Sequence, residues 1–503
     1  MGEANAYPEL SADEAAATIQ NNATVGFSGF TAAGSPKVIP AALAQRAEEF
    51  HRKGEVFQVR VLAGASTGNA VDNVLAEADA VSYRAPYQSS KSMRNLINQE
   101  KMDFVDFHLS HFPQVLKFGF LGNVDVAVVE ATEVTRDGRV YLTTGIGASP
   151  ALLEKAGKVL IEINRFHSPR LCEMIDIFTL PLPPHRSPIP IYHPLDRIGF
   201  PYATVDPSKV VGVVYTDIAD DEESFNPAAP IHERIAENVV GFLHGEMEAG
   251  RIPKTFLPVQ SGVGNVGNAV MEGLGKHPEI PPFYMYTEVF QNSCMELLKS
   301  GKIAGASTCG LVISKANLEE MYSNMNAFVD KIVLRPQELS NNPGLARRLG
   351  VIAMNTALEM DIYGNVNSSH VCGTSMMNGL GGSGDFERNA YLAIFMAPSY
   401  AKGGRISAVV PMCSHIDSSE HSVEVLVTEQ GVADLRGLSP RARARSIIDN
   451  CAHPAYRDYL NHYVESASPG HIRHDLKRCF DLHRNLMEKG AMLPDLDMSI
   501  FDK

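Results

Sequence analysis

The chain has 503 residues, of which 45% are hydrophobic and 20% charged, and its formal net charge at pH 7 is −14. The apolar share is large enough for sizeable cores, and the charged share is too small for a disordered acidic protein. An acidic balance argues against a dedicated nucleic-acid-binding protein, which would carry a basic excess. At roughly 100–200 residues per domain, the length is typical of two large domains.

The sequence shows no membrane-spanning or secretory segment. No stretch reaches the roughly 18–20 continuous apolar residues of a transmembrane helix, and residues 1–20 lack the basic and apolar regions of a signal peptide. The seven cysteines are widely spaced and form no Cys-x-x-Cys pair. This pattern favours reduced, buried thiols. We therefore expect a cytoplasmic protein that binds no metal, no membrane and no nucleic acid.

The first half of the chain alternates helical patterns with short β-branched runs. Ser11 and Glu14 form a Ser-x-x-Glu capping box, which predicts a helix to about residue 21. A second helix is predicted over 36–52, with Pro36 in its first turn. Strands are predicted at 24–30, 56–62, 124–129, 158–163 and 210–215. This alternation predicts parallel βαβ units and a mostly parallel sheet.

A proline-rich and then acidic stretch separates the two halves. Residues 181–194 contain six prolines and cannot form a helix or a central strand. Residues 217–230 are acidic and loop-like, and a new helix with apolar residues at helical spacing begins near Ile231. We place a domain boundary here and predict an N-terminal α/β domain at 1–218 and a C-terminal α/β domain at 230–503.

Two glycine-rich segments are candidates for ligand contact. Residues 260–270 lie between an apolar run and a helical pattern, where backbone N–H groups can bind an anion or oxyanion. Their Gly-x-Gly-x-x-Gly spacing also matches the dinucleotide-binding fingerprint, although no clear ribose-binding acid accompanies it. Residues 378–386 contain four glycines within six positions. They form either a flexible loop or a rigid loop whose N–H groups face a developing charge.

A third segment, 64–68, reads Gly-Ala-Ser-Thr-Gly and formally matches the nucleophile elbow of serine hydrolases. No acid or histidine partner for Ser66 is identifiable, so a plain glycine turn at a strand end is favoured. Four loop histidines leave a metal site open, but solvated side chains are favoured for them as well. They are His185, His193, His415 and His421. These patterns predict ligand-facing loops in an α/β protein and do not name a reaction.

Four motifs give the chain a resemblance to a known family. They are Gln260-Ser261-Gly262-Val263-Gly264-Asn265, Tyr286-Thr287-Glu288-Val289, Asn378 to Phe386, and Thr428-Glu429-Gln430-Gly431. In combination they resemble the acetyl-CoA hydrolase/transferase family, whose CoA-transferases use a glutamate nucleophile. The resemblance runs from about Ser11 to Leu493. It implies two related α/β domains with mostly parallel sheets, an active site at the domain interface, and a homodimer.

The resemblance places the nucleophile on Glu288, in a motif where Thr287 replaces the family's serine and keeps its hydroxyl. It also implies that Asn341 and Glu429 orient the nucleophile or the carboxylate substrate. Without the resemblance, Glu288 would be interpreted as a surface acid at a helix end, Asn341 as an ordinary turn residue and Glu429 as a solvated acid.

The resemblance further implies that the backbone N–H groups of Val263 and Gly382 stabilise the oxyanion of each tetrahedral intermediate. Lys402 would meet a phosphate or the pantetheine of coenzyme A, although from the residues alone an exposed loop lysine is equally favoured. The full set of implied coenzyme A contacts is Gly262, Val263, Gly264, Asn265, Val266, Leu358, Asn378, Gly382 and Lys402.

The implied activity moves CoA between short acyl groups, with propionyl-CoA and succinate as the expected pair. Glu288 would attack the thioester, and the reaction would pass through an acyl-glutamyl anhydride and a glutamyl–CoA thioester. Coenzyme A would then be a substrate and covalent intermediate, not a tightly bound cofactor. Three alternatives remain open: succinyl-CoA with acetate as the substrate pair, hydrolysis of an acyl-CoA thioester, and acyl-CoA binding without catalysis.

Overall fold

The computed structural model describes residues 7–222 and 229–501, and the chain divides into two compact units, each built from several segments. The first unit contains residues 1–224, 284–349 and 378–385, and the second contains 225–283, 350–377 and 386–503. Spatial contact therefore groups the segments that carry Glu288, Asn341 and Gly382 with the N-terminal residues. The domains at 1–218 and 230–503, which follow chain order, stay a prediction.

The N-terminal part of the first unit contains a nine-stranded, mostly parallel sheet. Its order is β4 (Asp103–Phe104), β3 (Val81–Ala85), β2 (Val59–Ala63), β1 (Thr24–Phe27), β5 (Val124–Val134), β6 (Arg139–Leu142) and β8 (Ala203–Thr204), with β7 (Ala156–Asn164) on β5 and β9 (Val210–Thr216) on β7. Strands β2, β1, β5, β7 and β9 pair in parallel, whereas β6 and β8 are antiparallel. The predicted parallel α/β arrangement is confirmed.

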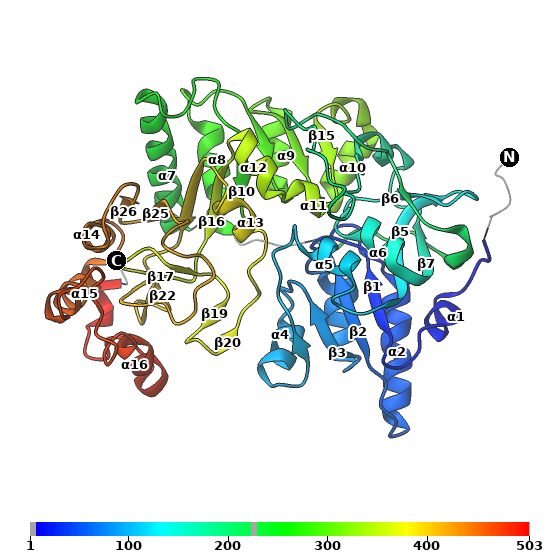
Figure 1. The fold of residues 1–503 in the computed structure, drawn as a ribbon, viewed down its shortest axis with the longest axis horizontal. Coiled ribbons are helices and arrows are strands. Elements are labelled where there is room, and N and C mark those ends of the chain that lie inside the picture. Colours follow the sequence, from blue (N-terminus) through cyan, green and yellow to red (C-terminus); the bar gives the residue numbers. More distant parts are fainter. Residues whose placement is uncertain (1–6, 223–228, 502–503) are drawn as a thin grey trace. The chain divides into compact units, whose positions relative to one another are not determined.

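Helices of the same unit pack on this sheet. They are α1 (Ala12–Ala17), α2 (Val38–Arg52), α3 (Val74–Glu77), α4 (Lys91–Asn98), α5 (Phe112–Phe118) and α6 (Ser149–Lys155), with a π-helical turn at Asn69–Asn73. Leu43 of α2 shares a buried cluster with Val25 of β1. Both elements are blue in Figure 1. The capping box at the start of α1 is confirmed, because Ser11 and Glu14 each accept a hydrogen bond from the other's backbone N–H.

Helix α2 begins at Val38, so our prediction that Pro36 lies in its first turn was wrong. The N–H groups at this helix start find a partner on another element. The Glu162 carboxylate, on β7, accepts hydrogen bonds from the backbone N–H groups of Lys37, Val38 and Ile39 at 2.6–3.2 Å. A buried carboxylate brought in by the sheet thus stabilises the helix start.

The later segments of the first unit contain further parallel strands. In chain order they contain β11 (Phe283–Tyr286), β12 (Val289–Gln291), α9 (Asn292–Lys299), β13 (Ile303–Thr308), β14 (Gly310–Val312), α10 (Lys315–Ser323), β15 (Ile332–Leu334), α11 (Gln337–Ser340) and α12 (Pro343–Leu349). Strand β13 pairs in parallel with β15, and β12 with β14. The short helix α13 (Ser383–Glu387) starts at the end of the glycine-rich loop.

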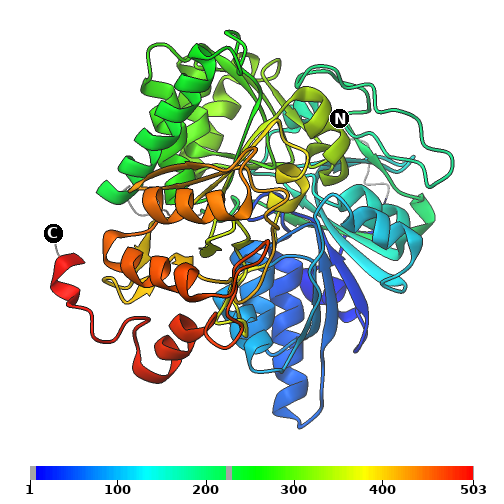
Figure 2. The same cartoon turned by 60° about the vertical axis from the view of Figure 1, so that its left-hand side comes forward.

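The second unit is built on parallel strands that lie side by side. The order is β10 (Val259–Ser261), β16 (Ile352–Thr356), β21 (Leu392–Met396), β25 (Val425–Thr428) and β26 (Gly431–Asp434), of which only β26 is antiparallel. Helix α7 (Pro230–Glu248) begins where predicted and buries Ile235, Val239 and Leu243. It packs against α8 (Asn265–Lys276), and both are green in Figure 2.

Short strands and three C-terminal helices complete the second unit. The strands are β17 (Glu359–Asp361), β18 (Val366–Asn367), β19 (His370–Val371), β20 (Ser375–Met376), β22 (Tyr400–Ala401), β23 (Ile406–Ser407) and β24 (Val409–Val410). The helices are α14 (Pro440–Asn450), α15 (Pro454–Ser466) and α16 (Asp481–Lys489). Helices α14 and α15, orange in Figure 2, lie beside one another and share a core with Leu426.

Several loop and side-chain predictions can be compared with the structure. Residues 181–194 form no helix or strand, as their prolines predict. Part of the predicted acidic loop, 223–228, lies outside the described residues. All seven cysteines are free thiols, and five of them are buried. Within residues 7–222 and 229–501, no helix has both the length and the apolar character needed to cross a membrane.

Candidate active site

Glu288 lies in the turn between β11 and β12, where neighbouring strands hold its main chain. Its carbonyl oxygen accepts hydrogen bonds from the Cys309 N–H and from the Thr308 hydroxyl, each at 2.9 Å. The next residue, Val289, pairs with Gly310 in the β12–β14 ladder. Glu288 is thus not the helix-end acid that its local sequence indicates. A rigid strand-to-strand turn presents its carboxyl group.

Asn341 contacts the Glu288 carboxyl group directly. It follows helix α11, is fully buried, and donates a hydrogen bond from Nδ2 to Glu288 Oε2 at 2.6 Å. The Asn341 Oδ1 atom accepts a hydrogen bond from Ser340 Oγ at 2.7 Å. A neutral donor at this distance orients the carboxylate and favours its ionised form. The structure therefore brings together these two residues, which the resemblance selected.

Gly382 lies against the same carboxyl group. A Cβ atom built on Gly382 would stand 1.5 Å from Glu288 Oε2, a distance that no side chain can occupy. The residue is buried, and two other glycines of the loop, Gly379 and Gly381, have positive φ angles of 148° and 64°. The loop therefore needs glycine at 382 for close approach and at 379 and 381 for conformation.

The surroundings of Glu288 raise its pKa to about 7. Loss of solvent around the carboxyl group is the largest cause, the hydrogen bond from Asn341 opposes it, and the negative charge of Asp385 adds to it. The side chain nevertheless keeps part of its surface exposed. A carboxylate with a raised pKa that stays accessible is a better nucleophile than a fully solvated one.

Other residues that the resemblance selected lie in the second unit, at the carboxyl ends of parallel strands of one sheet. Gly262 follows β10, Leu358 follows β16 and Glu429 follows β25. The Gly262 N–H donates to the Met354 carbonyl oxygen at 2.9 Å, which continues the β10–β16 ladder into the glycine turn. In α/β sheets, ligands bind at this edge.

The turn between β10 and α8 has the form of an anion-binding helix start. Gly264, with φ 122°, precedes the first residue of α8, Asn265, and Val266 is buried below it. Gly267 faces the Gly262 carbonyl oxygen so closely that a Cβ would stand 2.4 Å from it. Val263 is 37% exposed at the tip of this turn. Its backbone is thus available to a ligand at the N-terminus of a 12-residue helix.

Glu429 and Lys402 lie in adjoining parts of the second unit. Glu429 accepts hydrogen bonds from the Ser399 N–H at 2.8 Å, from the Ser399 hydroxyl, and from Gln430 Nε2 at 2.9 Å. Lys402 is exposed in the β22–β23 hairpin turn, with φ 50°. Leu358 is 39% exposed, and its N–H bonds to the Asn367 carbonyl oxygen. Glu429 is therefore an anchored acid, not the freely solvated one that its local sequence indicates.

The remaining selected residue, Asn378, lies in the first unit at the start of the glycine-rich loop. Its Oδ1 atom accepts a hydrogen bond from the Gly379 N–H at 2.8 Å, which fixes the turn. The structure thus assembles Glu288, Asn341 and Gly382 within the first unit. Gly262 to Val266, Leu358, Lys402 and Glu429 belong to the second.

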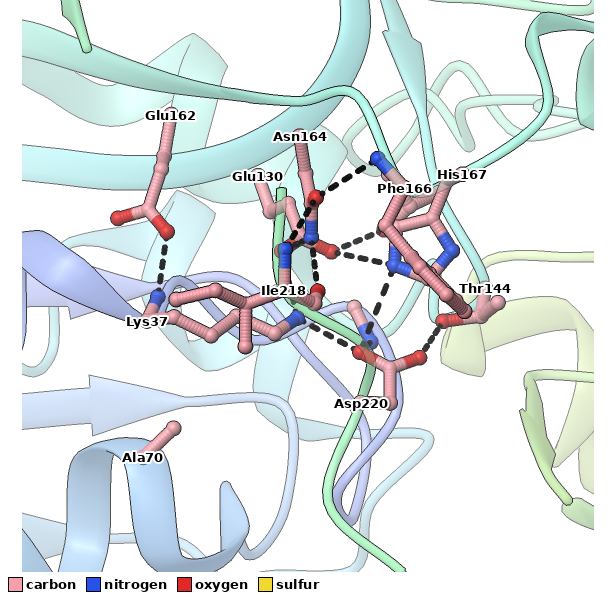
Figure 3. A network of polar contacts seen from close by, with 12 residues as sticks. Lys37, Ala70, Glu130, Thr144, Glu162, Asn164, Phe166, His167, Ile218 and Asp220 are labelled. Atoms are coloured by element: carbon pink, nitrogen blue, oxygen red, sulfur yellow. Dashed lines mark hydrogen bonds and ion pairs between the residues drawn. The ribbon is translucent and has the colours of Figure 1, made fainter. Parts of the chain in front are cut away.

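A buried ionic network supports the turn that follows strand β6 in the first unit. The Lys37 ammonium group lies 2.5 Å from Glu130 Oε2 and 2.6 Å from Asp220 Oδ1, and the His167 Nε2 atom lies 3.3 Å from Glu130 Oε1 (Figure 3). Burial lowers the pKa of His167, but the charges of Asp220 and Glu130 outweigh it and raise that pKa to about 9. Two positive and two negative groups therefore balance inside the protein.

This network reaches the strands beside Glu288. Thr144 donates a hydrogen bond from its hydroxyl to Asp220, and its carbonyl oxygen accepts one from the Leu311 N–H at 2.9 Å. Leu311 belongs to β14, which pairs with β12 immediately after Glu288. Sequence patterns gave no sign of this network, because its members are separated by up to 183 residues.

The structure can be compared with two alternatives that the sequence left open: Ser66 as a nucleophile, and the loop histidines as metal ligands. The Ser66 hydroxyl donates to Asp72 Oδ2 at 3.1 Å and accepts from Ser89 at 2.9 Å, so it is engaged in the turn. In the described part of the chain, two clusters have ligand distances compatible with a metal, and neither contains one of the four predicted histidines. These clusters are Glu130–His167–Asp220 and His244–His277–Glu279.

The two clusters differ in their partners. In the first, the Lys37 ammonium group contacts Glu130 and Asp220, so this cluster lacks the open donor set of a metal site. In the second, His244 Nε2 lies 2.7 Å from Glu279 Oε2, and the Glu279 N–H bonds to His277 Nδ1, so these contacts lie among the three residues themselves.

Comparison with known proteins supplies the family. The acetyl-CoA hydrolase/transferase N-terminal domain matches residues 1–215, and the C-terminal domain of the same family matches residues 318–464. Propanoyl-CoA:succinate CoA transferase of Escherichia coli strain K12 is 57% identical over 97% of this chain and 99% of its own. Succinyl-CoA:acetate CoA-transferase of Clostridium kluyveri is 46% identical over 96% and 90%. Acetyl-CoA hydrolase of Schizosaccharomyces pombe is 42% identical over 95% and 94%.

Solved structures share the fold. RipA from Yersinia pestis superimposes with a TM-score of 0.69 and 22% identity, covering 90% of this chain and 96% of that one. A 4-hydroxybutyrate CoA-transferase from Porphyromonas gingivalis gives a TM-score of 0.61 and 21% identity, covering 91% and 97%. Two matched domain families and relatives aligned over nearly the full length lead to one conclusion. The chain belongs to the acetyl-CoA hydrolase/transferase family.

Proposed function

We propose that this protein is a CoA-transferase that converts propionyl-CoA and succinate to propionate and succinyl-CoA. The observation that carries the proposal is the Glu288 carboxyl group, held by Asn341 at 2.6 Å and covered by the glycine at 382. The choice of substrates is supported by the E. coli relative, which is 57% identical and is named for this pair. Coenzyme A acts here as a substrate, not as a resident cofactor.

The first half of the proposed reaction loads CoA onto the protein. A Glu288 carboxylate oxygen attacks the acyl carbonyl carbon, the C–S bond breaks, and CoA leaves as a thiolate. The product is an acyl-glutamyl anhydride. The thiolate then attacks the glutamyl carbonyl carbon and expels propionate, which leaves a glutamyl–CoA thioester. The bond energy of the substrate thioester is retained in this intermediate.

The second half reverses these steps with succinate. A succinate carboxylate attacks the glutamyl carbonyl carbon and expels the CoA thiolate, which forms a succinyl-glutamyl anhydride. The thiolate attacks the succinyl carbonyl carbon, and the Glu288 carboxylate is the leaving group. Succinyl-CoA departs and the protein returns to its starting state. Because the first product must leave before the second substrate reacts, ping-pong kinetics are expected.

Backbone N–H groups serve as the electrophilic partners in this proposal. Each attack produces a tetrahedral oxyanion, and we assign its stabilisation to the N–H groups of Gly382 and Val263. Gly382 contacts Glu288 closely, and Val263 is exposed at the start of α8, so both backbones suit this role. One such donor can contribute about 2.7–4 kcal/mol to transition-state stability.

The coenzyme A chain is assigned to Gly262 to Val266, Leu358, Asn378, Gly382 and Lys402. Support comes from exposure and position: Leu358 and Lys402 are exposed, and Gly262 and Leu358 follow neighbouring parallel strands. Lys402 supplies a positive charge for a phosphate group. Glu429, anchored on Ser399, is assigned to orienting the carboxylate substrate. The family resemblance also supports a homodimer and a location in the cytoplasm. Light scattering of the purified protein tests whether it is a dimer.

Hydrolysis is the second candidate function. It is favoured by the relatives named acetyl-CoA hydrolase, which are 40–42% identical to this chain. The two activities share the glutamyl–CoA thioester and differ in whether a carboxylate or water attacks it. A protein that only bound acyl-CoA would not need a glutamate presented beneath a close-packed glycine loop.

The experiment that tests the proposal is a mass-resolved inventory of CoA species after the protein is mixed with propionyl-CoA and succinate. Transfer predicts succinyl-CoA with no accumulation of free CoA. Free CoA formed independently of succinate identifies a hydrolase. If propionyl-CoA is unchanged with succinate, succinyl-CoA with acetate is the next pair, and inactivity with both rejects catalysis on these substrates.

A further inference from the structure

Asp385 is a buried acid for which the proposed reaction has no assigned role. It lies in α13, three positions after Gly382, and is 2% exposed. The Ser110 N–H donates to Asp385 Oδ2 at 2.8 Å, and the Ser110 hydroxyl donates to Oδ1 at 2.5 Å. These residues are 275 positions apart and belong to the same compact unit. Both carboxylate oxygens are thus held by one serine from the N-terminal segment.

Asn341 lies against both Glu288 and the glycine-rich loop. Its Nδ2 atom donates to Glu288 Oε2, and the same atom would lie 2.8 Å from a Cβ atom built on Gly382. Burial raises the pKa of Asp385 to about 7, and the side chain of Asn341 acts in the opposite direction. The Asn341 amide oxygen accepts a hydrogen bond from Ser340.

These contacts allow only one orientation of the Asn341 amide. A 180° flip would turn its oxygen toward the Glu288 carboxylate, where two acceptors would face each other without a donor. Because the amide also lies against Gly382, displacement of the loop would disturb this hydrogen bond.

Asp385 also ties down the loop that covers the nucleophile. Its backbone N–H donates to the Gly382 carbonyl oxygen at 3.1 Å, which closes the turn at the start of α13. Asp106 Oδ2 accepts a hydrogen bond from the Leu380 N–H at 2.5 Å and anchors the same loop two residues earlier. The position of Gly382 against Glu288 thus depends on contacts with the 106–110 segment.

We infer that Asp385 is a positioning residue for the Glu288 nucleophile: held by Ser110, its carboxylate anchors the loop that places Gly382 against Glu288 and Asn341, in the arrangement that nucleophilic attack requires. This inference rests on the proposed function, because it concerns the same carboxyl group. Asp385 acts through the loop and is not assigned a contact with substrate.

The test compares Asp385→Asn, Ser110→Ala and Glu387→Gln. Asp385→Asn replaces one carboxylate oxygen by an NH2 group, which cannot accept a hydrogen bond, so one of the two bonds from Ser110 is lost. Because the affected hydrogen bonds involve charged groups, kcat is expected to fall about 10–100-fold, while KM for propionyl-CoA changes much less. Ser110→Ala keeps the Asp385 charge but frees its carboxylate, and a smaller fall in kcat is expected.

Glu387→Gln is the matched control. Glu387 is a buried acid on the same short helix, 7% exposed, and within the described residues its Oε2 atom has no hydrogen-bond partner. If burial of an acid in α13 were all that mattered, this variant would lose as much activity as Asp385→Asn. We expect its kcat to stay near that of the unchanged protein.

The pH profile separates positioning from a purely structural role. The negative charge of Asp385 raises the pKa of Glu288, and burial raises the pKa of Asp385 itself to about 7, so the two carboxyl groups titrate over the same range. Asp385→Asn removes that charge and should move the acidic limb of kcat/KM to lower pH. Three other titratable groups pack nearby: the His108 imidazole, the Asp106 carboxylate and the Cys309 thiol. Of these, His108 lies against Gly384. None of them changes in this variant.

The outcomes are distinguishable. Asp385→Asn with unchanged kcat and an unchanged acidic limb overturns the inference. If Asp385→Asn fails to fold, the Ser110→Ala variant tests the inference in its place. An unchanged kcat in Ser110→Ala also overturns the inference. Glu288→Gln is measured in parallel. Retained turnover in Glu288→Gln rejects the proposed function itself, whereas an inactive Glu288→Gln with a normal Asp385→Asn rejects only the role of Asp385.

Discussion

Asn341 Nδ2 lies 2.6 Å from Glu288 Oε2, although 53 residues separate them along the chain. Asn341 is fully buried and follows a short helix, whereas Glu288 lies in a strand-to-strand turn. A buried, neutral donor can hold a carboxylate in one orientation without neutralising its charge. The pair therefore combines the two properties that a carboxylate nucleophile needs, a fixed position and an available lone pair.

Replacing Asn341 by Ala should lower kcat about 10–100-fold, because a hydrogen bond to the charged nucleophile is lost. Loss of that bond also removes an effect that lowers the pKa of Glu288, so the acidic limb of the rate profile should move to higher pH. Steady-state kinetics across pH check both effects.

Asn342→Ala is the control for that variant. The Asn342 Oδ1 atom accepts hydrogen bonds from the Gly344 and Leu345 N–H groups at the start of α12, so its removal should cost about 1 kcal/mol of stability. Its kcat should be unchanged. Equal losses of kcat in the two variants would contradict a specific role for Asn341.

Replacing Gly382 by Ala should abolish turnover while the fold survives. The added methyl group would stand 1.5 Å from Glu288 Oε2, so the carboxyl group or the loop must move. Gly403→Ala is a suitable comparison, because nothing lies within 4 Å of its Cβ position, although its positive φ angle adds strain. Activity in Gly382→Ala near that of the unchanged protein would show that close approach of the loop is dispensable.

Activity should depend on pH through Glu288, whose pKa is raised to about 7 by loss of solvent. The carboxylate is the nucleophilic form, so kcat/KM should fall as the pH decreases below about 7. Stability should respond in the opposite sense. A raised pKa in the folded state means that Glu288 contributes most stability when protonated and that this contribution is lost as the pH rises through about 7.

Thermal unfolding at several pH values checks this sign. Glu288→Gln, which cannot ionise, should gain stability relative to the unchanged protein between pH 5 and pH 8. A constant difference in midpoint across that range would show that Glu288 has an ordinary pKa.

Replacing Lys37 by Met should destabilise the first unit by about 3–5 kcal/mol, because Glu130 and Asp220 would lose the buried charge that balances them. Chemical denaturation measures this loss. Lys158→Met, at an exposed position on β7, should change stability little. A Lys37→Met variant as stable as that control would mean that the network of Figure 3 is not balanced by this lysine.

Local patterns predicted local structure well. The reciprocal bonds between Ser11 and Glu14 involve residues three apart, so a sequence motif suffices to predict them. The start of α2 was predicted wrongly because its N–H groups bond to Glu162, which lies on a strand more than a hundred positions further along the sequence. A local sequence pattern cannot predict a helix cap that is supplied by a residue on a distant strand.

The same distinction applies to the site. Family motifs selected Glu288, Asn341 and Gly382, and the structure brings these three together. Asp385 stood within a quoted motif without an assigned role, because its partner Ser110 is 275 residues away and lies in no recognised pattern. Residues that position a nucleophile are specified by packing between distant segments, and packing is not visible in a linear sequence.

The central claim is that Glu288 carries CoA covalently during turnover. The most direct measurement is the intact mass of the protein after incubation with propionyl-CoA in the absence of any acceptor acid. The account predicts an added mass equal to CoA less one water in the unchanged protein, located on the peptide that contains Glu288, and no adduct in Glu288→Gln. An adduct that persists in Glu288→Gln, or turnover with no adduct in the unchanged protein, would contradict it.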